Sequence, residues 1–164
     1  MDEFTDLGTG NYFRRFEPHM EGTGQIHFKM NKPLPSAKTK RSLHILCIDD
    51  DEQILEMLQA CLAHYGHRVR VASGGKYGLE QFCIAILKSE PYDVVITDLG
   101  MPDIDGCQVA WAIKIESPNT PVILLTAWGS TVKDDAAIVS TVDAVLSKPP
   151  RIEELNDLLL RLAG

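Results

Sequence analysis

The sequence predicts an α/β fold: a doubly wound five-stranded parallel sheet with helices on both faces. Two observations predict it. Between residues 43 and 164, short apolar runs alternate five times with longer segments of helical periodicity. The runs are apolar at nearly every position, as expected of strands buried between two helix layers. Because connections between parallel strands are right-handed, this order gives a doubly wound sheet.

The elements follow from local patterns. The strand candidates are short runs rich in Val, Ile and Leu, at 43–48, 68–72, 92–97, 120–126 and 144–147. Helix candidates with apolar residues three and four positions apart follow them, at 52–65, 76–88, 106–115, 133–142 and 150–162. Gly66 suits the position after the first helix, and Pro150 suits the first position of the last one.

Residues 1–42 differ from the rest of the chain. They contain several Gly and Pro residues and no sustained period, and the stretch 31–42 is polar, basic and proline-bearing. We therefore expect a flexible N-terminal extension and linker over 1–42 and a single domain over 43–164. Two alternatives stay open for the extension, namely a docking peptide anchored by its aromatic residues and a start codon assigned too early.

Composition narrows the classes of function. The chain has 164 residues and a formal net charge of −7, and residues 43–164 carry nine Lys or Arg against eighteen Asp or Glu. An acidic body argues against nucleic-acid binding. The longest apolar runs are too short to span a membrane, and the acidic N-terminus is unlike a secretory signal, so a cytoplasmic location is expected. The four cysteines form no CxxC pair and are predicted to be small buried residues.

Polar side chains follow four of the predicted strands. Asp49 and Asp50 end the first, Asp98 the third, Thr126 the fourth, and Lys148 follows the fifth. Since parallel strands end at one edge of the sheet, we expect these groups to converge. Clustered carboxylates repel one another unless a cation such as Mg²⁺ is held between them. A carboxylate, a metal, a Lys and a hydroxyl are what phosphoryl transfer to an Asp requires.

Four motifs carry a family resemblance: ILCIDDDEQIL (45–55), VVITDLGMPDIDG (94–106), VILLTAWG (122–129) and VLSKPP (145–150). Together they make residues 43–164 similar to the receiver domain of response regulators in two-component signalling, whose fold is flavodoxin-like. The resemblance covers about three-quarters of the chain and leaves out residues 1–42.

The resemblance implies roles in phosphorylation and metal binding. Asp98 would be the phosphoacceptor. Asp50 would be the main direct Mg²⁺ ligand, Asp49 would bind the ion mostly through water, and Asp98 and the backbone carbonyl of Gly100 would complete the metal site. Gly100 and Trp128 hold positions that flank the path of attacking water, so they would modulate dephosphorylation.

The resemblance also implies a switch. Thr126 and Lys148 would bind the phosphoryl group, with Thr126 acting as the switch hydroxyl, and the Lys148–Pro149 peptide bond would be cis. One position departs from the family, because Val145 stands where an aromatic switch residue is usual. Coupling from Thr126 to the last strand is therefore expected to be altered.

The expected function is that of a phosphoacceptor receiver. A histidine kinase or a histidine phosphotransfer protein would donate the phosphoryl group, with Mg²⁺ as cofactor, and an unidentified downstream protein would bind the switched surface. The chain would catalyse only its own phosphorylation and dephosphorylation, so it is not expected to be an enzyme. No output domain is expected within it.

Two alternatives come from other classes. The first is a receiver fold used as a phosphorylation-independent interaction module, which Val145 favours. The second is an aspartyl-phosphate phosphatase, because Asp49 and Asp51 have the spacing of that class's nucleophile and second acid. No insertion large enough to cap a substrate follows them, which counts against a phosphatase.

Overall fold

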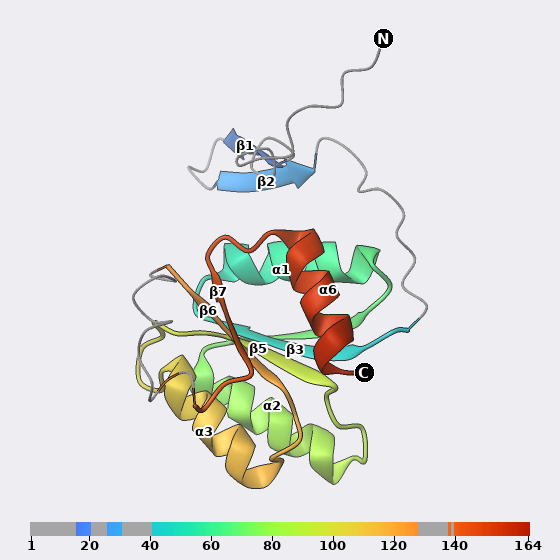
Figure 1. The fold of residues 1–164 in the computed structure, drawn as a ribbon. Helices are drawn as coiled ribbons and strands as arrows, with labels where there is room; N and C mark the ends of the chain where they lie inside the picture. The colour runs from blue at the N-terminus through green and yellow to red at the C-terminus, as the bar shows by residue number, and fades with distance from the viewer. Residues whose placement is uncertain (1–15, 21–25, 31–40, 128–137, 139) are drawn as a thin grey trace. The chain divides into compact units, whose positions relative to one another are not determined.

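The computed structural model describes residues 16–20, 26–30, 41–127, 138 and 140–164 (Figure 1). The chain divides into two compact units, Met1–Pro35 and Ser36–Gly164. This boundary falls before the one predicted from the sequence, within the linker assigned to 31–42. The flexibility predicted for residues 1–42 stays a prediction.

The first unit contains a pair of strands. β1 (Phe16–Met20) and β2 (Ile26–Met30) pair antiparallel, with Phe16 opposite Met30 and Met20 opposite Ile26. No strand was predicted here, because polar residues and Pro18 interrupt the alternation that normally marks a strand. The pairing depends on contacts between the two segments and not on the pattern of either one.

The second unit is built on the predicted sheet. Its strands are β3 (His44–Asp49), β4 (Arg68–Ser73), β5 (Val94–Asp98), β6 (Val122–Thr126) and β7 (Ala144–Ser147). They are all parallel, in the order β4-β3-β5-β6-β7. The chain runs from β3 outward to β4 and then returns past β3 to β5. The strand order therefore reverses between β3 and β5, where sheets of this kind form their sites.

Helices cover both faces of this sheet, which confirms the doubly wound prediction. α1 (Glu52–His64) and α6 (Ile152–Leu162) lie on one face, and α2 (Gly75–Leu87) and α3 (Gly106–Glu116) lie on the other (Figure 1). The helix predicted over 133–142 falls almost wholly outside the described residues.

The start of α6 corrects one detail. Arg151 has an extended backbone, with φ −71° and ψ 118°, and it caps the helix. Helical geometry therefore begins at Ile152, and Pro150 precedes the cap instead of opening the helix.

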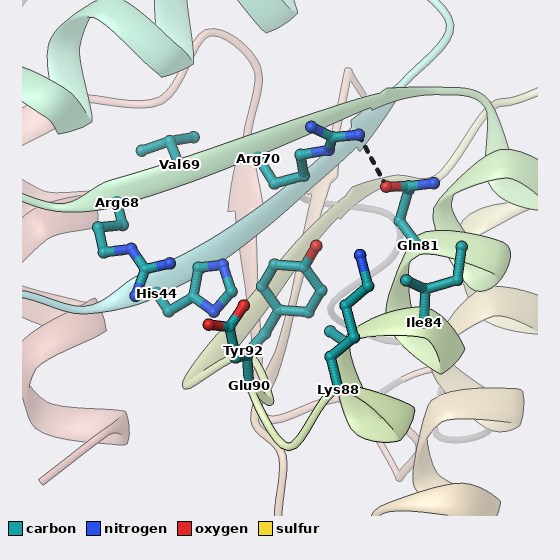
Figure 2. Close-up of a pocket in the computed structure, with 10 residues that line it drawn as sticks. His44, Arg68, Val69, Arg70, Gln81, Ile84, Lys88, Glu90 and Tyr92 are labelled. Atoms are coloured by element: carbon teal, nitrogen blue, oxygen red, sulfur yellow. Dashed lines mark hydrogen bonds between the residues drawn. The ribbon is translucent and has the colours of Figure 1, made fainter.

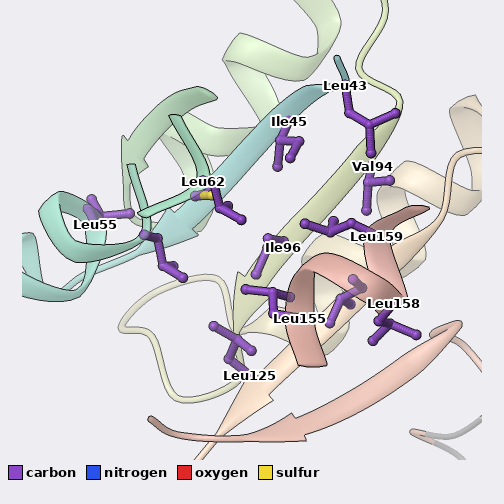
Figure 3. Close-up of a cluster of buried hydrophobic side chains, with 13 residues drawn as sticks. Leu43, Ile45, Leu55, Leu62, Val94, Ile96, Leu125, Leu155, Leu158 and Leu159 are labelled. Atoms are coloured by element: carbon purple, nitrogen blue, oxygen red, sulfur yellow. The ribbon is translucent and has the colours of Figure 1, made fainter. Parts of the chain in front are cut away.

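Two apolar clusters hold the sheet between its helix layers. Figure 3 shows the cluster on the α1/α6 side, where Ile45 and Ile96 from the sheet meet leucines such as Leu62 and Leu155. Alternate residues of the same strands, such as Leu46 and Val95, belong to the cluster on the α2/α3 side. The central strands are thus packed against helices on both faces, and this packing positions the ends of the strands relative to one another.

The cysteine prediction is half right. Cys47 and Cys61 are buried, whereas Cys83 is exposed and Cys107 is half-buried. Cys83 belongs to α2, whose apolar face is wide enough that periodicity alone does not place it. In the described part of the chain, no helix is long and apolar enough to cross a membrane.

Candidate functional site

Neighbouring strands bring three carboxylates together. Asp49 and Asp98 are the last residues of β3 and β5, which pair directly, and Asp50 follows Asp49. One carboxylate oxygen from each of Asp49, Asp50 and Asp98 lies within 4.8 Å of the other two. Asp49 and Asp98 are buried, and Asp50 is exposed at the rim. The convergence predicted from the strand ends is therefore present.

Lys148 joins two of these acids. Its Nζ lies 2.7 Å from Oδ2 of Asp49 and 2.8 Å from Oδ1 of Asp98. Its backbone N–H donates to the carbonyl of Thr126 at 2.8 Å, which ties the segment after β7 to the end of β6. The Lys148–Pro149 bond is cis, as the resemblance implied.

Charge in this site is unevenly compensated. Burial raises the pKa of Asp49, and the opposing effects of Lys148 and of the Asp51 backbone N–H do not cancel that rise. Burial alone would lower the pKa of Lys148, but its ion pairs with Asp49 and Asp98 outweigh burial and raise it. The ammonium is thus held in its charged form between the two acids.

The acids fit a divalent cation. Three carboxylates face a single ammonium, and the buried Oδ2 of Asp49 has no hydrogen-bond partner of good geometry, although Lys148 contacts it as an ion pair. Hard cations such as Mg²⁺ bind carboxylate oxygens, often completing their shell with water and backbone carbonyls. Asp49, Asp50 and Asp98 are the residues that could hold such an ion.

Backbone groups orient the two buried acids. The N–H of Gly100 donates to Oδ2 of Asp98 at 3.1 Å, and the N–H of Asp51 donates to Oδ1 of Asp49 at 3.0 Å. Asp51 itself accepts a 2.9 Å bond from the Gln53 N–H and caps α1. Among the described residues, the carboxylates that cluster are those of Asp49, Asp50 and Asp98, and Asp51 is not in this group, which counts against the Asp49/Asp51 pair of the phosphatase alternative.

The remaining predicted residues have mixed placements. Thr126 is buried at the end of β6, next to β5 in the sheet. Val145 is half-buried in β7, opposite Leu124 of β6. Trp128 lies outside the described residues.

The importance of Gly106 was not predicted from the sequence. A Cβ at this position would collide with the backbone oxygen of Asp98 and lie 2.8 Å from Cδ1 of Leu124. α3 therefore begins in direct contact with the acidic site. The available signal was a glycine at the first position of a helix, where better helix formers are usual.

Comparison with known proteins agrees with the geometry. The family model for the response regulator receiver domain matches residues 45–160, so the chain belongs to this family. Receiver domains of two-component systems are phosphorylated by histidine kinases and bind Mg²⁺ at their acidic pocket.

Two curated relatives illustrate the match. The chain is 39% identical over 106 residues to the transcriptional regulatory protein GlrR of Escherichia coli K12, covering 65% of this chain and 23% of that protein. It is 31% identical over 112 residues to the response regulator ArlR of Staphylococcus epidermidis, covering 68% and 48%. The chain thus spans a quarter to a half of these relatives.

Solved structures share the fold. A response regulator receiver domain protein from Clostridium thermocellum has a TM-score of 0.66 at 30% identity, covering 74% of this chain and 94% of that one. The response regulator TrrA of Thermotoga maritima, solved in complex with Mg²⁺ and BeF, has a TM-score of 0.63 at 30% identity, covering 73% and 98%.

Proposed function

We propose that Asp98 accepts a phosphoryl group from a phosphorylated histidine of a kinase or phosphotransfer protein. One observation carries the proposal. The Lys148 ammonium contacts Oδ1 of Asp98 at 2.8 Å, while Asp49 and Asp50 bring their carboxylates to the same edge of the sheet. This arrangement supplies a nucleophile, a fixed positive charge and a cation-binding set within a few ångströms.

The transfer exchanges one phosphorus bond for another. A carboxylate oxygen of Asp98 attacks the phosphorus and forms an O–P bond, and the P–N bond to the donor histidine breaks. The electron pair of that bond stays on the donor imidazole, which takes up a proton. Lys148 neutralises charge on the transferred group, and the buried Thr126 at the neighbouring strand end offers a hydroxyl donor.

Mg²⁺ held by Asp49, Asp50 and Asp98 would neutralise further charge on the phosphoryl oxygens. In this proposal the chain modifies only itself and turns over no metabolite.

Hydrogen bonding of Thr126 to the phosphoryl group draws the end of β6 inward. The surface of β7 and α6 then changes its affinity for a downstream protein.

Phosphorylation by a small-molecule donor tests the proposal. The purified chain is incubated with acetyl phosphate and Mg²⁺, and intact mass is measured. We expect a gain of one phosphoryl mass that disappears in Asp98→Ala and when the metal is chelated. Asp157→Ala is the matched control, because it removes an exposed carboxylate from α6.

No mass gain in a folded protein would overturn the proposal. A gain that survives Asp98→Ala would overturn the assignment of the acceptor.

A second candidate is a phosphorylation-independent interaction module. Val145 favours it, because a valine cannot turn inward as an aromatic ring does when Thr126 moves. In that case Asp98→Ala would leave partner binding unchanged, whereas the receiver proposal expects binding to depend on phosphorylation at Asp98.

A further inference from the structure

A hollow of about 330 Å³ opens where β3 and β4 begin, at the opposite end of the sheet from the acidic site. His44 and Arg68 are the first residues of these two strands. The second half of α2, from Gln81 onward, and its C-cap residue Lys88 form the other wall, as Figure 2 shows. The receiver chemistry described above uses no residue of this hollow.

The arginines of β4 face a side of the sheet that is normally apolar. Val69 packs with the cluster on the α1/α6 side, and Ala72 belongs to the cluster on the α2/α3 side. Because side chains alternate along a strand, Arg68 and Arg70 point toward α2, on the same face as Ala72. β4 is an edge strand, and both arginines stay exposed at the border of the helix layer.

The hollow is locally cationic in an acidic chain. Arg68, Arg70 and Lys88 line it, and Glu90 is the one carboxylate among the lining residues. In the part of the chain that the structure describes, no carboxylate forms an ion pair with any of these three cations. The hollow is therefore positively charged although the whole chain has a net charge of −7.

The floor and one wall are preorganised. Tyr92 is 7% exposed, and the ring of His44 lies 4.3 Å from its ring, centroid to centroid. Arg70 Nη2 donates to Oε1 of Gln81 at 2.9 Å, which fixes the guanidinium at the mouth (Figure 2). Arg70 also acts on the phenol, because its charge opposes the rise that burial causes in the pKa of Tyr92.

We propose that this hollow binds the phosphate group of a small phosphate ester. A doubly charged oxyanion suits a hollow lined by three cationic side chains better than a single carboxylate does, and a guanidinium suits its geometry. The volume is that of a small-molecule site. His44 and Tyr92 add a ring surface beside the cations, on which an organic substituent of the ester can pack.

The experiment is an NMR titration of the full chain without Mg²⁺. The probes are inorganic phosphate and adenosine 5′-monophosphate, with adenosine and sodium chloride as uncharged and ionic-strength controls. Reporter signals are the side-chain Nε–H groups of Arg68 and Arg70 and the backbone amide of Val69. The backbone amide of Lys148 reports separately on the acidic site. We expect saturable shifts at the hollow with both phosphate probes and none with either control.

Charge-removing variants locate the binding. Arg70→Gln combined with Lys88→Gln should weaken phosphate binding about tenfold or more, because charge-assisted hydrogen bonds are lost. Arg161→Gln, which removes an exposed charge from the last turn of α6, should change it less than twofold. Arg68→Gln serves as an independent second variant. Tighter binding of the nucleotide than of phosphate would support an ester as the ligand, and equal binding would overturn the ester and identify free phosphate.

Other outcomes overturn the proposal. One is the absence of saturable shifts at the hollow, and another is a set of shifts that the Arg70/Lys88 double variant leaves unchanged. A third is that the double variant self-associates while phosphate never binds. The arginines would then be charges that protect the edge strand β4 from pairing with another chain.

Discussion

The ammonium nitrogen of Lys148 lies 2.8 Å from Oδ1 of Asp98, and the same atom lies 2.7 Å from Asp49. A divalent cation bound by these acids would draw on the same negative charge. Lys148 and the metal therefore compete electrostatically, although the site needs both for phosphoryl transfer. This competition makes the response of the protein to Mg²⁺ a direct probe of the site.

Replacing Lys148 with methionine should make the protein more dependent on Mg²⁺. Without metal, Lys148→Met leaves the buried carboxylates of Asp49 and Asp98 without their cationic partner, which should lower the free energy of unfolding by about 3 kcal/mol. Mg²⁺ should then stabilise the variant more than the unmodified protein. Urea unfolding with and without Mg²⁺ measures both effects.

The matched control for that experiment is Lys76→Met, which removes an exposed ammonium from α2. It should change the free energy of unfolding by less than about 0.5 kcal/mol. Equal stabilisation of Lys148→Met and the unmodified protein by Mg²⁺ would show that Lys148 and the metal do not share the carboxylates.

Asp49→Asn should stabilise the metal-free protein. Burial raises the pKa of Asp49 in the folded state, so the folded state binds this proton more tightly than the unfolded state does. The contribution of this bound proton to the free energy of unfolding is complete below the pKa that Asp49 has in the unfolded state. It disappears as the pH rises through the pKa that Asp49 has in the folded state. At neutral pH the ionised carboxyl therefore costs stability, and the amide should recover about 0.5–2 kcal/mol.

Chemical denaturation across a pH series measures this gain. The advantage of Asp49→Asn should grow as the pH rises above the ordinary carboxyl range, and the variant should lose Mg²⁺-dependent stabilisation. Asp157→Asn, at an exposed position of α6, should show neither effect. A gain that does not change with pH would assign the effect to something other than the ionisation of Asp49.

The sequence could predict the site because strand ends are predictable. Asp49, Asp98, Thr126 and Lys148 each follow an apolar run, and parallel strands must end at one edge. The bridge that Lys148 makes between two acids was not predictable, because it depends on the path of a long, flexible side chain.

Two other features could not be predicted without knowing which strands are neighbours in the sheets. β1 was not recognised from its sequence because Glu17 and Pro18 interrupt the expected pattern of a strand. Pairing with β2, and not local alternation of apolar residues, defines that strand. The strand pattern of Arg68 to Ala72 was recognised, but the role of its arginines depends on β4 being an edge strand. Strand order is a tertiary property that a single strand does not encode.

A buried hydrogen-bond chain should anchor α6 to the start of the sheet. The Leu43 N–H donates to Nδ1 of His67 at 3.2 Å, so Nε2 carries the ring proton and donates to Oδ1 of Asn156 at 2.9 Å. Asn156→Ala would leave the His67 Nε2–H buried without its acceptor. We expect a loss of about 1–3 kcal/mol in the free energy of unfolding.

Urea denaturation tests this loss against Asn119→Ala, which makes the same chemical change at an exposed position. The control should lie within about 0.5 kcal/mol of the unmodified protein. If Asn156→Ala costs no more than Asn119→Ala, the His67–Asn156 bond does not contribute to holding α6.

Two glycines near Asp98 offer a final test, because they differ in the space around them. At Gly106 an added Cβ would collide with the backbone oxygen of Asp98, so the start of α3 must move. At Gly100 the nearest atom to an added Cβ is Asp98 Oδ2, at 3.8 Å, which is ordinary van der Waals contact.

Gly106→Ala should therefore lower the free energy of unfolding by about 1–3 kcal/mol and slow phosphorylation of Asp98, since it displaces the loop beside the acceptor. Gly100→Ala should fold with nearly unchanged stability. Denaturation curves and acetyl phosphate labelling of both variants provide the measurement. Equal stability and equal labelling rates would show that the close approach of α3 to Asp98 does not position the acceptor.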